Sequence, residues 1–162
     1  MIRVAIVDDH PVVRLGLRVA LEGSDRIALV GEGSSLADAR DVVRDAAPDV
    51  LLLDLRLPDG RAIDEIEALR ALRPGMHVVV LTGQGTAEDA HAALAGGASG
   101  YLLKDDVVET LVDSLTEIVA GKVVVAPMVR AELAELDDAS VLTKREREVL
   151  ALVVEGCTKP EI

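Results

Sequence analysis

Side chains that handle cations and phosphate follow several apolar stretches in the first part of this chain. Asp8 and Asp9 follow an apolar run at the N-terminus, and Asp54 follows a second one. Two further runs end in a hydroxyl and an ammonium side chain, at Thr82 and Lys104. If the runs are parallel strands, their carboxyl ends meet at the edge of the sheet where open α/β folds bind ligands. We therefore expect these five residues to converge on one site.

The types of these side chains point to phosphoryl chemistry. Clustered carboxylates repel one another, so a cation must neutralise them if all are to stay ionised. A ligand set of oxygens, with neither His nor Cys, suits a hard ion such as Mg²⁺. A carboxylate beside such an ion can attack a phosphoryl group, whose oxygens the ion, an ammonium and a hydroxyl can hold. The alternative, that each Asp only caps a turn, explains single residues but not the whole set.

Composition singles out the stretch near residue 104. Lys104 is the only Lys among the first 121 residues, in which the other ten basic residues are Arg. Tyr101 is the only aromatic residue of the chain. The three histidines, His10, His77 and His91, are scattered along the sequence, so we interpret them as structural and expect neither a catalytic triad nor a zinc site.

The elements that must position these residues alternate over residues 1–121. Five nearly all-apolar segments are typical of strands buried on both faces; they are Ile2–Val7, Ile27–Gly33, Val50–Leu53, His77–Leu81 and Ser99–Leu103. Amphipathic patterns between them predict helices near residues 11–22, 35–46, 61–73, 86–96 and 106–120. Five such units predict an α/β, flavodoxin-like (βα)5 fold with a doubly wound parallel sheet.

The pattern changes after Gly121. Residues 122–141 are interpreted as a linker with a short helix near residues 128–136, followed by a polar break. In residues 142–162, Leu142 and Thr143 lead into a predicted helix over residues 144–155, for which Thr143 and Glu146 form a capping box. We therefore predict a second, all-α unit after the linker.

Charge and hydropathy exclude several classes. The net charge is −12, of which residues 1–121 carry −10 (11 basic against 21 acidic residues). Such a domain is unsuited to contact DNA, because phosphate contacts dominate that binding. No apolar run approaches the ~20 residues that span a bilayer, and the N-terminus has no signal-peptide layout. We expect a cytoplasmic protein without a membrane partner.

Residues 1–121 resemble the receiver domain of two-component response regulators of the NarL/FixJ family. The stretches that carry the resemblance are VAIVDDHPVVRLGL, PDVLLLDLRLPDG, VVVLTG and GASGYLLKDD. The resemblance implies that Asp54 is the phosphoacceptor and that a sensor histidine kinase is the phosphoryl donor. It also implies that Asp8 and Asp9 hold Mg²⁺ together with Asp54 and the backbone carbonyl of Arg56.

The same resemblance implies how the site signals. Thr82 and Lys104 would bind the phosphoryl group, and Tyr101 would be a rotamer switch. The expected output is homodimerisation, in a regulator rather than an enzyme. The loop after Thr82, Gly83-Gln84-Gly85, is richer in Gly than the family pattern.

Residues 142–162, LTKREREVLALVVEGCTKPEI, resemble the start of a LuxR-type helix-turn-helix. The alternative is an ordinary amphipathic helix. Because base readout comes from the second helix of this motif, which the sequence does not include, we expect promoter binding only in a longer chain.

Three other classes of protein share parts of this pattern. A phosphatase of the haloacid dehalogenase type would show Asp-x-Asp-Gly after the first strand, where this chain has Asp8-Asp9-His10-Pro11. A nucleotide-binding module would need a Gly-rich loop at the same place. A pseudo-receiver, which acts as an interaction module without phosphorylation, remains the alternative.

Overall fold

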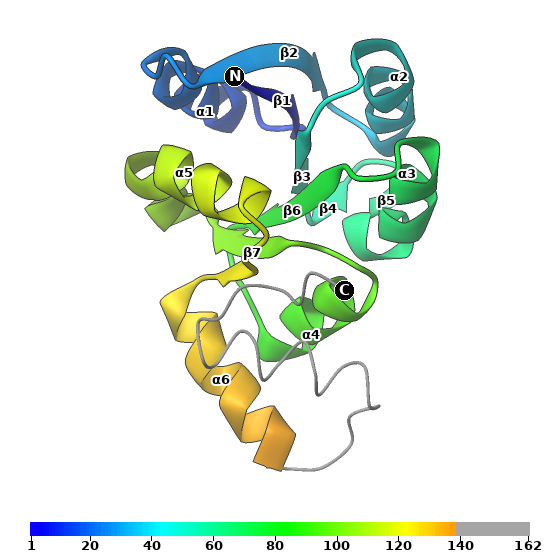
Figure 1. Cartoon of the computed structure of the whole chain (residues 1–162). Coiled ribbons are helices and arrows are strands. Elements are labelled where there is room, and N and C mark those ends of the chain that lie inside the picture. Colours follow the sequence, from blue (N-terminus) through cyan, green and yellow to red (C-terminus); the bar gives the residue numbers. More distant parts are fainter. Residues whose placement is uncertain (139–162) are drawn as a thin grey trace.

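One parallel sheet organises residues 1–138, the part of the chain that this computed structural model describes (Figure 1). The strand order is β2-β1-β3-β6-β7-β8, and all neighbours pair in parallel. The strands are β1 (Ile2–Val7), β2 (Ile27–Gly33), β3 (Val50–Asp54), β6 (His77–Thr82), β7 (Gly100–Leu103) and β8 (Val124–Val125). The predicted doubly wound α/β sheet is confirmed.

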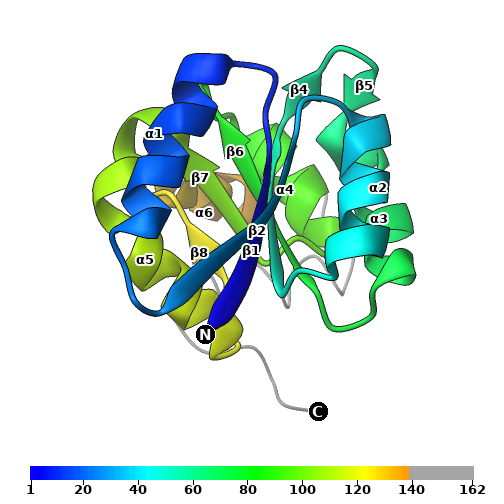
Figure 2. The same ribbon diagram turned by 90° about the horizontal axis from the view of Figure 1, so that it is seen from above.

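Helices cover both faces of the sheet because its strands are apolar on both sides. Figure 2 shows α1 (Pro11–Glu22) and α5 (Lys104–Val119) on one face. The other face is covered by α2 (Leu36–Ala46), α3 (Ile66–Leu72) and α4 (Ala87–Ala95). Successive strand residues point to opposite faces, so Leu51 and Leu53 pack into one apolar cluster and Val50 and Leu52 into the other. This burial makes β3 a rigid support for Asp54.

The loop after β3 is more elaborate than the predicted helix over residues 61–73. It contains a short hairpin, β4 (Arg56–Leu57) and β5 (Gly60–Arg61), and a 3-10 helix, Ala62–Asp64, before α3 begins. The Asp59 carboxylate of this hairpin accepts hydrogen bonds from the backbone N–H groups of Leu36 (2.8 Å) and Ala37 (3.0 Å). These bonds lower the pKa of Asp59 and cap the first turn of α2.

Residues 122–138, predicted as part of a linker, add a strand and a helix to the sheet domain. The backbone N–H of Ala126 donates to the carbonyl of Tyr101 (2.9 Å), and β8 adds a sixth strand beside β7. Helix α6 (Pro127–Asp138) then packs against α4, and it buries Val129 and Leu133 (Figure 1). The predicted helix-turn-helix over residues 142–162 lies outside the described residues, and the predicted domain boundaries stay predictions.

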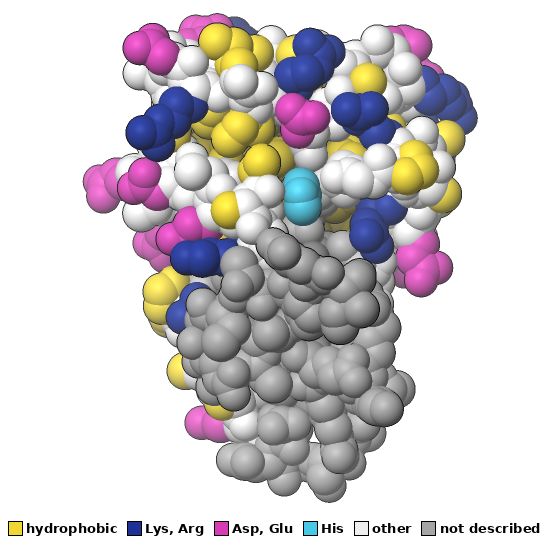
Figure 3. All heavy atoms as spheres, in the orientation of Figure 1, with side chains coloured by type: hydrophobic (Ala, Val, Ile, Leu, Met, Phe, Trp, Pro, Cys, Tyr) yellow, Lys and Arg dark blue, Asp and Glu magenta, His cyan; other side chains and the backbone are white. Residues whose placement is uncertain are grey.

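The described surface carries both signs of charge. On the face drawn in Figure 3, basic and acidic side chains are interspersed over the described part, with no broad basic area. No helix within residues 1–138 has the length and apolar character needed to cross a bilayer.

Candidate functional site

The carboxyl ends of the central strands form a pocket of ≈ 560 Å³. Asp54 is the last residue of β3, Thr82 is the last residue of β6, and Lys104 is the first residue of α5, directly after β7. All three line the pocket together with Arg56. Asp8 follows β1 and contacts Lys104 from one side. The predicted convergence of strand ends is therefore observed.

Lys104 connects the two buried carboxylates of this pocket. Its Nζ atom lies 2.7 Å from Oδ2 of Asp8 and 3.1 Å from Oδ2 of Asp54. The side chains of Asp8 and Asp54 are 0% and 5% exposed, and that of Lys104 is 11% exposed. Burial alone would lower the pKa of Lys104, but the two carboxylates outweigh it and raise that pKa. The ammonium is thus the internal counter-ion of the site.

The two carboxylates differ in how easily they ionise. Burial, and then the charge of Asp8, raise the pKa of Asp54 to about 6, although hydrogen bonding to Lys104 opposes the rise. Burial also opposes ionisation of Asp8, but hydrogen bonds from Lys104 and His10 outweigh it, and the pKa of Asp8 is lowered. Without further positive charge in the site, Asp54 is therefore harder to ionise than Asp8.

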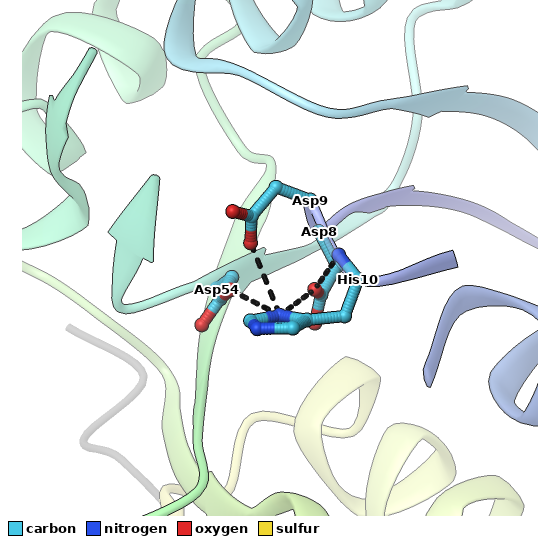
Figure 4. Close-up of side chains that lie close together, drawn as sticks. All are labelled: Asp8, Asp9, His10 and Asp54. Carbon is cyan, nitrogen blue, oxygen red and sulfur yellow. Dashed lines mark hydrogen bonds and ion pairs between the residues drawn. The ribbon is translucent and has the colours of Figure 1, made fainter. Parts of the chain in front are cut away.

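His10 belongs to the cluster, which the sequence did not indicate. Its Nδ1 atom lies 2.9 Å from Oδ1 of Asp8, 3.0 Å from Oδ1 of Asp9 and 3.6 Å from Oδ2 of Asp54 (Figure 4). His10 is the N-cap residue of α1, and its backbone N–H donates to Oδ1 of Asp8 (2.8 Å). His10, interpreted from the sequence as structural, therefore lies among the predicted cation ligands, and a ligand set of oxygens alone stays a prediction. The one signal in the sequence was that His10 directly follows the Asp pair.

These groups fit a divalent cation. One ligand atom from each of Asp8, Asp9, His10 and Asp54 lies within 4.8 Å of the others. Three carboxylates at this spacing repel one another unless a cation joins them. Arg56 lines the same pocket, and the use of its backbone carbonyl as a ligand stays a prediction.

Of the two remaining predicted residues, Thr82 lines the pocket and Tyr101 is buried beside the loop that follows Thr82. The Thr82 hydroxyl donates to the carbonyl of Gln84 (3.1 Å) and accepts from the Gln84 N–H (3.3 Å), so it is held by its own loop. Tyr101 is 0% exposed and lies against this loop at Gly85. Burial, and then the charge of Asp89, raise the pKa of Tyr101 to about 12. Tyr101 thus already occupies an inward position.

Comparisons with known proteins show the family of this chain. Residues 4–116 match the response regulator receiver domain family. The chain is 35% identical over 170 residues to the DNA-binding transcriptional activator DevR/DosR of Mycobacterium tuberculosis, covering 100% of this chain and 78% of that protein.

Two solved structures are similar. A LuxR-family two-component response regulator from Aurantimonas has a TM-score of 0.80 at 30% identity, over 85% of this chain and 99% of that one. A structure of two RcsB dimers bound to two parallel DNAs has a TM-score of 0.78 at 29% identity, over 96% of this chain and 77% of that one. The chain therefore belongs to the LuxR-type family of two-component response regulators, and its first domain is a receiver domain.

Proposed function

We propose that Asp54 accepts the phosphoryl group by which this response regulator is activated. The observation that carries the proposal is the position of Asp54 at the end of the central strand, buried beside Asp8 and Lys104 and lining the open pocket. Asp8 has no such access, because its side chain is 0% exposed and its carboxylate is bonded to Lys104 and His10. Asp54 is thus the carboxylate best placed to meet a donor.

The transfer requires little movement of the protein. A carboxylate oxygen of Asp54 forms a bond to phosphorus, while the bond from phosphorus to the nitrogen of the donor's phosphohistidine breaks. Lys104 is already near the reacting carboxylate and can contact one phosphoryl oxygen. Thr82 would exchange its bond to Gln84 for a second phosphoryl oxygen. These contacts stabilise the charge that spreads over the transferred group.

The cation proposed for the acidic cluster is Mg²⁺, held by Asp8, Asp9 and Asp54 with the carbonyl of Arg56. When bound, this ion neutralises the carboxylates and the incoming phosphoryl oxygens. The support from this chain is the gathering of ligand atoms from Asp8, Asp9, His10 and Asp54 within 4.8 Å of one another, where the carboxylates repel unless a cation joins them. Without a cation, repulsion between the carboxylates and the phosphoryl oxygens would oppose the transfer to Asp54.

The proposed partners are a sensor histidine kinase, a second copy of this chain and promoter DNA. One similar structure is of RcsB dimers bound to DNA, which supports dimerisation and DNA binding for this family. Promoter binding is proposed for the part of this regulator that follows the receiver domain. The described receiver carries a strong acidic excess, so it is not the DNA-binding part.

The test is labelling with acetyl phosphate in the presence of Mg²⁺. Wild type should gain the mass of one phosphoryl group, and Asp54→Asn should gain none while keeping its circular dichroism spectrum. Asp49→Asn is the matched control, because Asp49 is a partly exposed Asp just before β3 and outside the pocket. Equal labelling of wild type and Asp54→Asn would contradict the proposal, and a wild type that takes no label would favour the pseudo-receiver.

A further inference from the structure

The wall of the phosphoryl pocket includes an acidic side chain, Asp89, that the proposed transfer does not use. Asp89 and Asp54 both line this pocket. Asp89 belongs to the first turn of α4, where its backbone N–H donates to the hydroxyl of the N-cap residue Thr86 (3.1 Å). Its side chain is 20% exposed, so its charge is only partly hydrated. A phosphoryl group that enters the pocket therefore meets a negative charge in addition to that of Asp54.

Arg61 pairs with this carboxylate from the hairpin that follows Asp54. Nη2 of Arg61, the last residue of β5, lies 2.7 Å from Oδ1 of Asp89. The Arg61 side chain is 46% exposed, and ion pairs open to water in this way contribute little to stability. Either partner can therefore be replaced by a neutral side chain of similar size without loss of the fold.

The charge of Asp89 acts over a distance inside the receiver domain. Burial, and then the charge of Asp89, raise the pKa of Tyr101 to about 12, and the charge of Arg61 partly opposes this rise. The Tyr101 ring lies against Gly85, in the loop after Thr82. The field of Asp89 thus extends to the loop that forms part of the pocket wall, and Arg61 offsets some of it.

We propose that Asp89 slows, and Arg61 promotes, the arrival of anionic phosphoryl donors at Asp54. The inference rests on the proposed function, because it takes Asp54 as the acceptor. Small donors such as acyl phosphates carry negative charge, which Asp89 repels and the Arg61 guanidinium attracts. Both side chains act through their charges and touch none of the reacting atoms, so they tune the rate of encounter and leave the chemical step unchanged.

The experiment measures the second-order rate of labelling of the full chain by acetyl phosphate with Mg²⁺, followed by mass spectrometry. At low salt, Asp89→Asn should raise this rate by about two- to fivefold, and Arg61→Gln should lower it by about as much, because one unit charge a few ångströms away has an effect of this size through water. The double variant should return close to the wild-type rate. Salt at about 1 M shortens the Debye length to roughly 3 Å and should remove both effects.

Two variants control for effects that do not depend on the pocket. Glu88→Gln removes the neighbouring acid from the first turn of α4, and Glu88 does not line this pocket. Arg18→Gln breaks a second ion pair, with Glu32 (2.8 Å), at a separate place on the surface. Both controls should be labelled at close to the wild-type rate.

The signs of the two rate changes decide the inference. Changes in the same direction for Asp89→Asn and Arg61→Gln would overturn it, because the pair would then act as a mechanical link between α4 and the hairpin. Rate changes that persist at high salt, or wild-type rates for both variants at low salt, would overturn it as well. Asp54→Asn separates the two proposals. If Asp54→Asn is labelled, both fail; if it takes no label while the Asp89 and Arg61 variants match wild type, only this inference fails.

Discussion

The ammonium of Lys104 lies 2.7 Å from a carboxylate oxygen of Asp8 that is fully buried. The same ammonium is 3.1 Å from Asp54, so one cation holds two buried carboxylates that would otherwise repel each other. In the absence of a metal ion, this bridge is the main source of positive charge in the site. Removal of the Lys104 ammonium should therefore lower the free energy of unfolding, because the buried carboxylates would then repel each other without a counter-ion.

Lys104→Met should destabilise the metal-free protein by about 3 kcal/mol, because it leaves buried carboxylates unpaired. Lys122→Met is the control, since Lys122 lies outside the pocket and a surface change costs within about 0.5 kcal/mol. Urea denaturation measures both. Mg²⁺ should restore more stability to Lys104→Met than it adds to wild type. Equal free energies of unfolding for Lys104→Met and wild type would show that the bridge contributes nothing.

Asp54→Asn should stabilise the metal-free fold at neutral pH by on the order of 1–3 kcal/mol. The folded-state pKa of Asp54 is raised to about 6, so the folded protein binds its proton more tightly than the unfolded chain does. Protonation of Asp54 therefore stabilises the wild-type fold at low pH, and this stabilisation is lost as pH rises from about 4 to about 6. Asp54→Asn has no proton to lose at this position. The stability difference should grow across this window, measured by thermal unfolding at several pH values. A difference that does not change with pH would contradict the raised pKa.

The loop after Thr82 offers a matched pair of glycines. A Cβ on Gly85 would lie 2.8 Å from Leu103, 3.0 Å from Val129 of α6 and 3.2 Å from Tyr101, whereas a Cβ on Gly83 would meet nothing within 4 Å. Gly85→Ala should therefore cost about 1–3 kcal/mol by overpacking. Gly83→Ala should be nearly neutral. Hydrogen exchange should show faster exchange of α6 amides in Gly85→Ala only; equal effects of the two substitutions would refute a close contact between α6 and this loop.

The sequence was sufficient to place the strand ends but not the details between them. Nearly all-apolar runs predicted the five strands β1, β2, β3, β6 and β7. Parallel pairing then required Asp54, Thr82 and Lys104 to meet. The position of His10 could not be predicted, because it depends on the side-chain rotamer and on a backbone bond to Asp8. A single histidine after an Asp pair carries no periodic signal.

Long-range contacts explain the other differences. The pattern of residues 122–141 predicted a linker with a short helix, but pairing of β8 with β7 depends on the exposed edge of the finished sheet. Similarly, Asp59 caps α2 from 22 and 23 residues away in the sequence, a contact that local patterns do not indicate. Both are tertiary effects that override local propensity.

The most direct test of the account locates the phosphorylated residue chemically. Borohydride reduces an aspartyl phosphate to homoserine, so treatment after acetyl phosphate and Mg²⁺ marks the acceptor permanently. Peptide mass spectrometry of the wild-type chain should then find homoserine at position 54 and unchanged aspartate at positions 8 and 9. Homoserine at position 8 or 9, with Asp54 intact, would contradict the assignment of Asp54 as the phosphoacceptor.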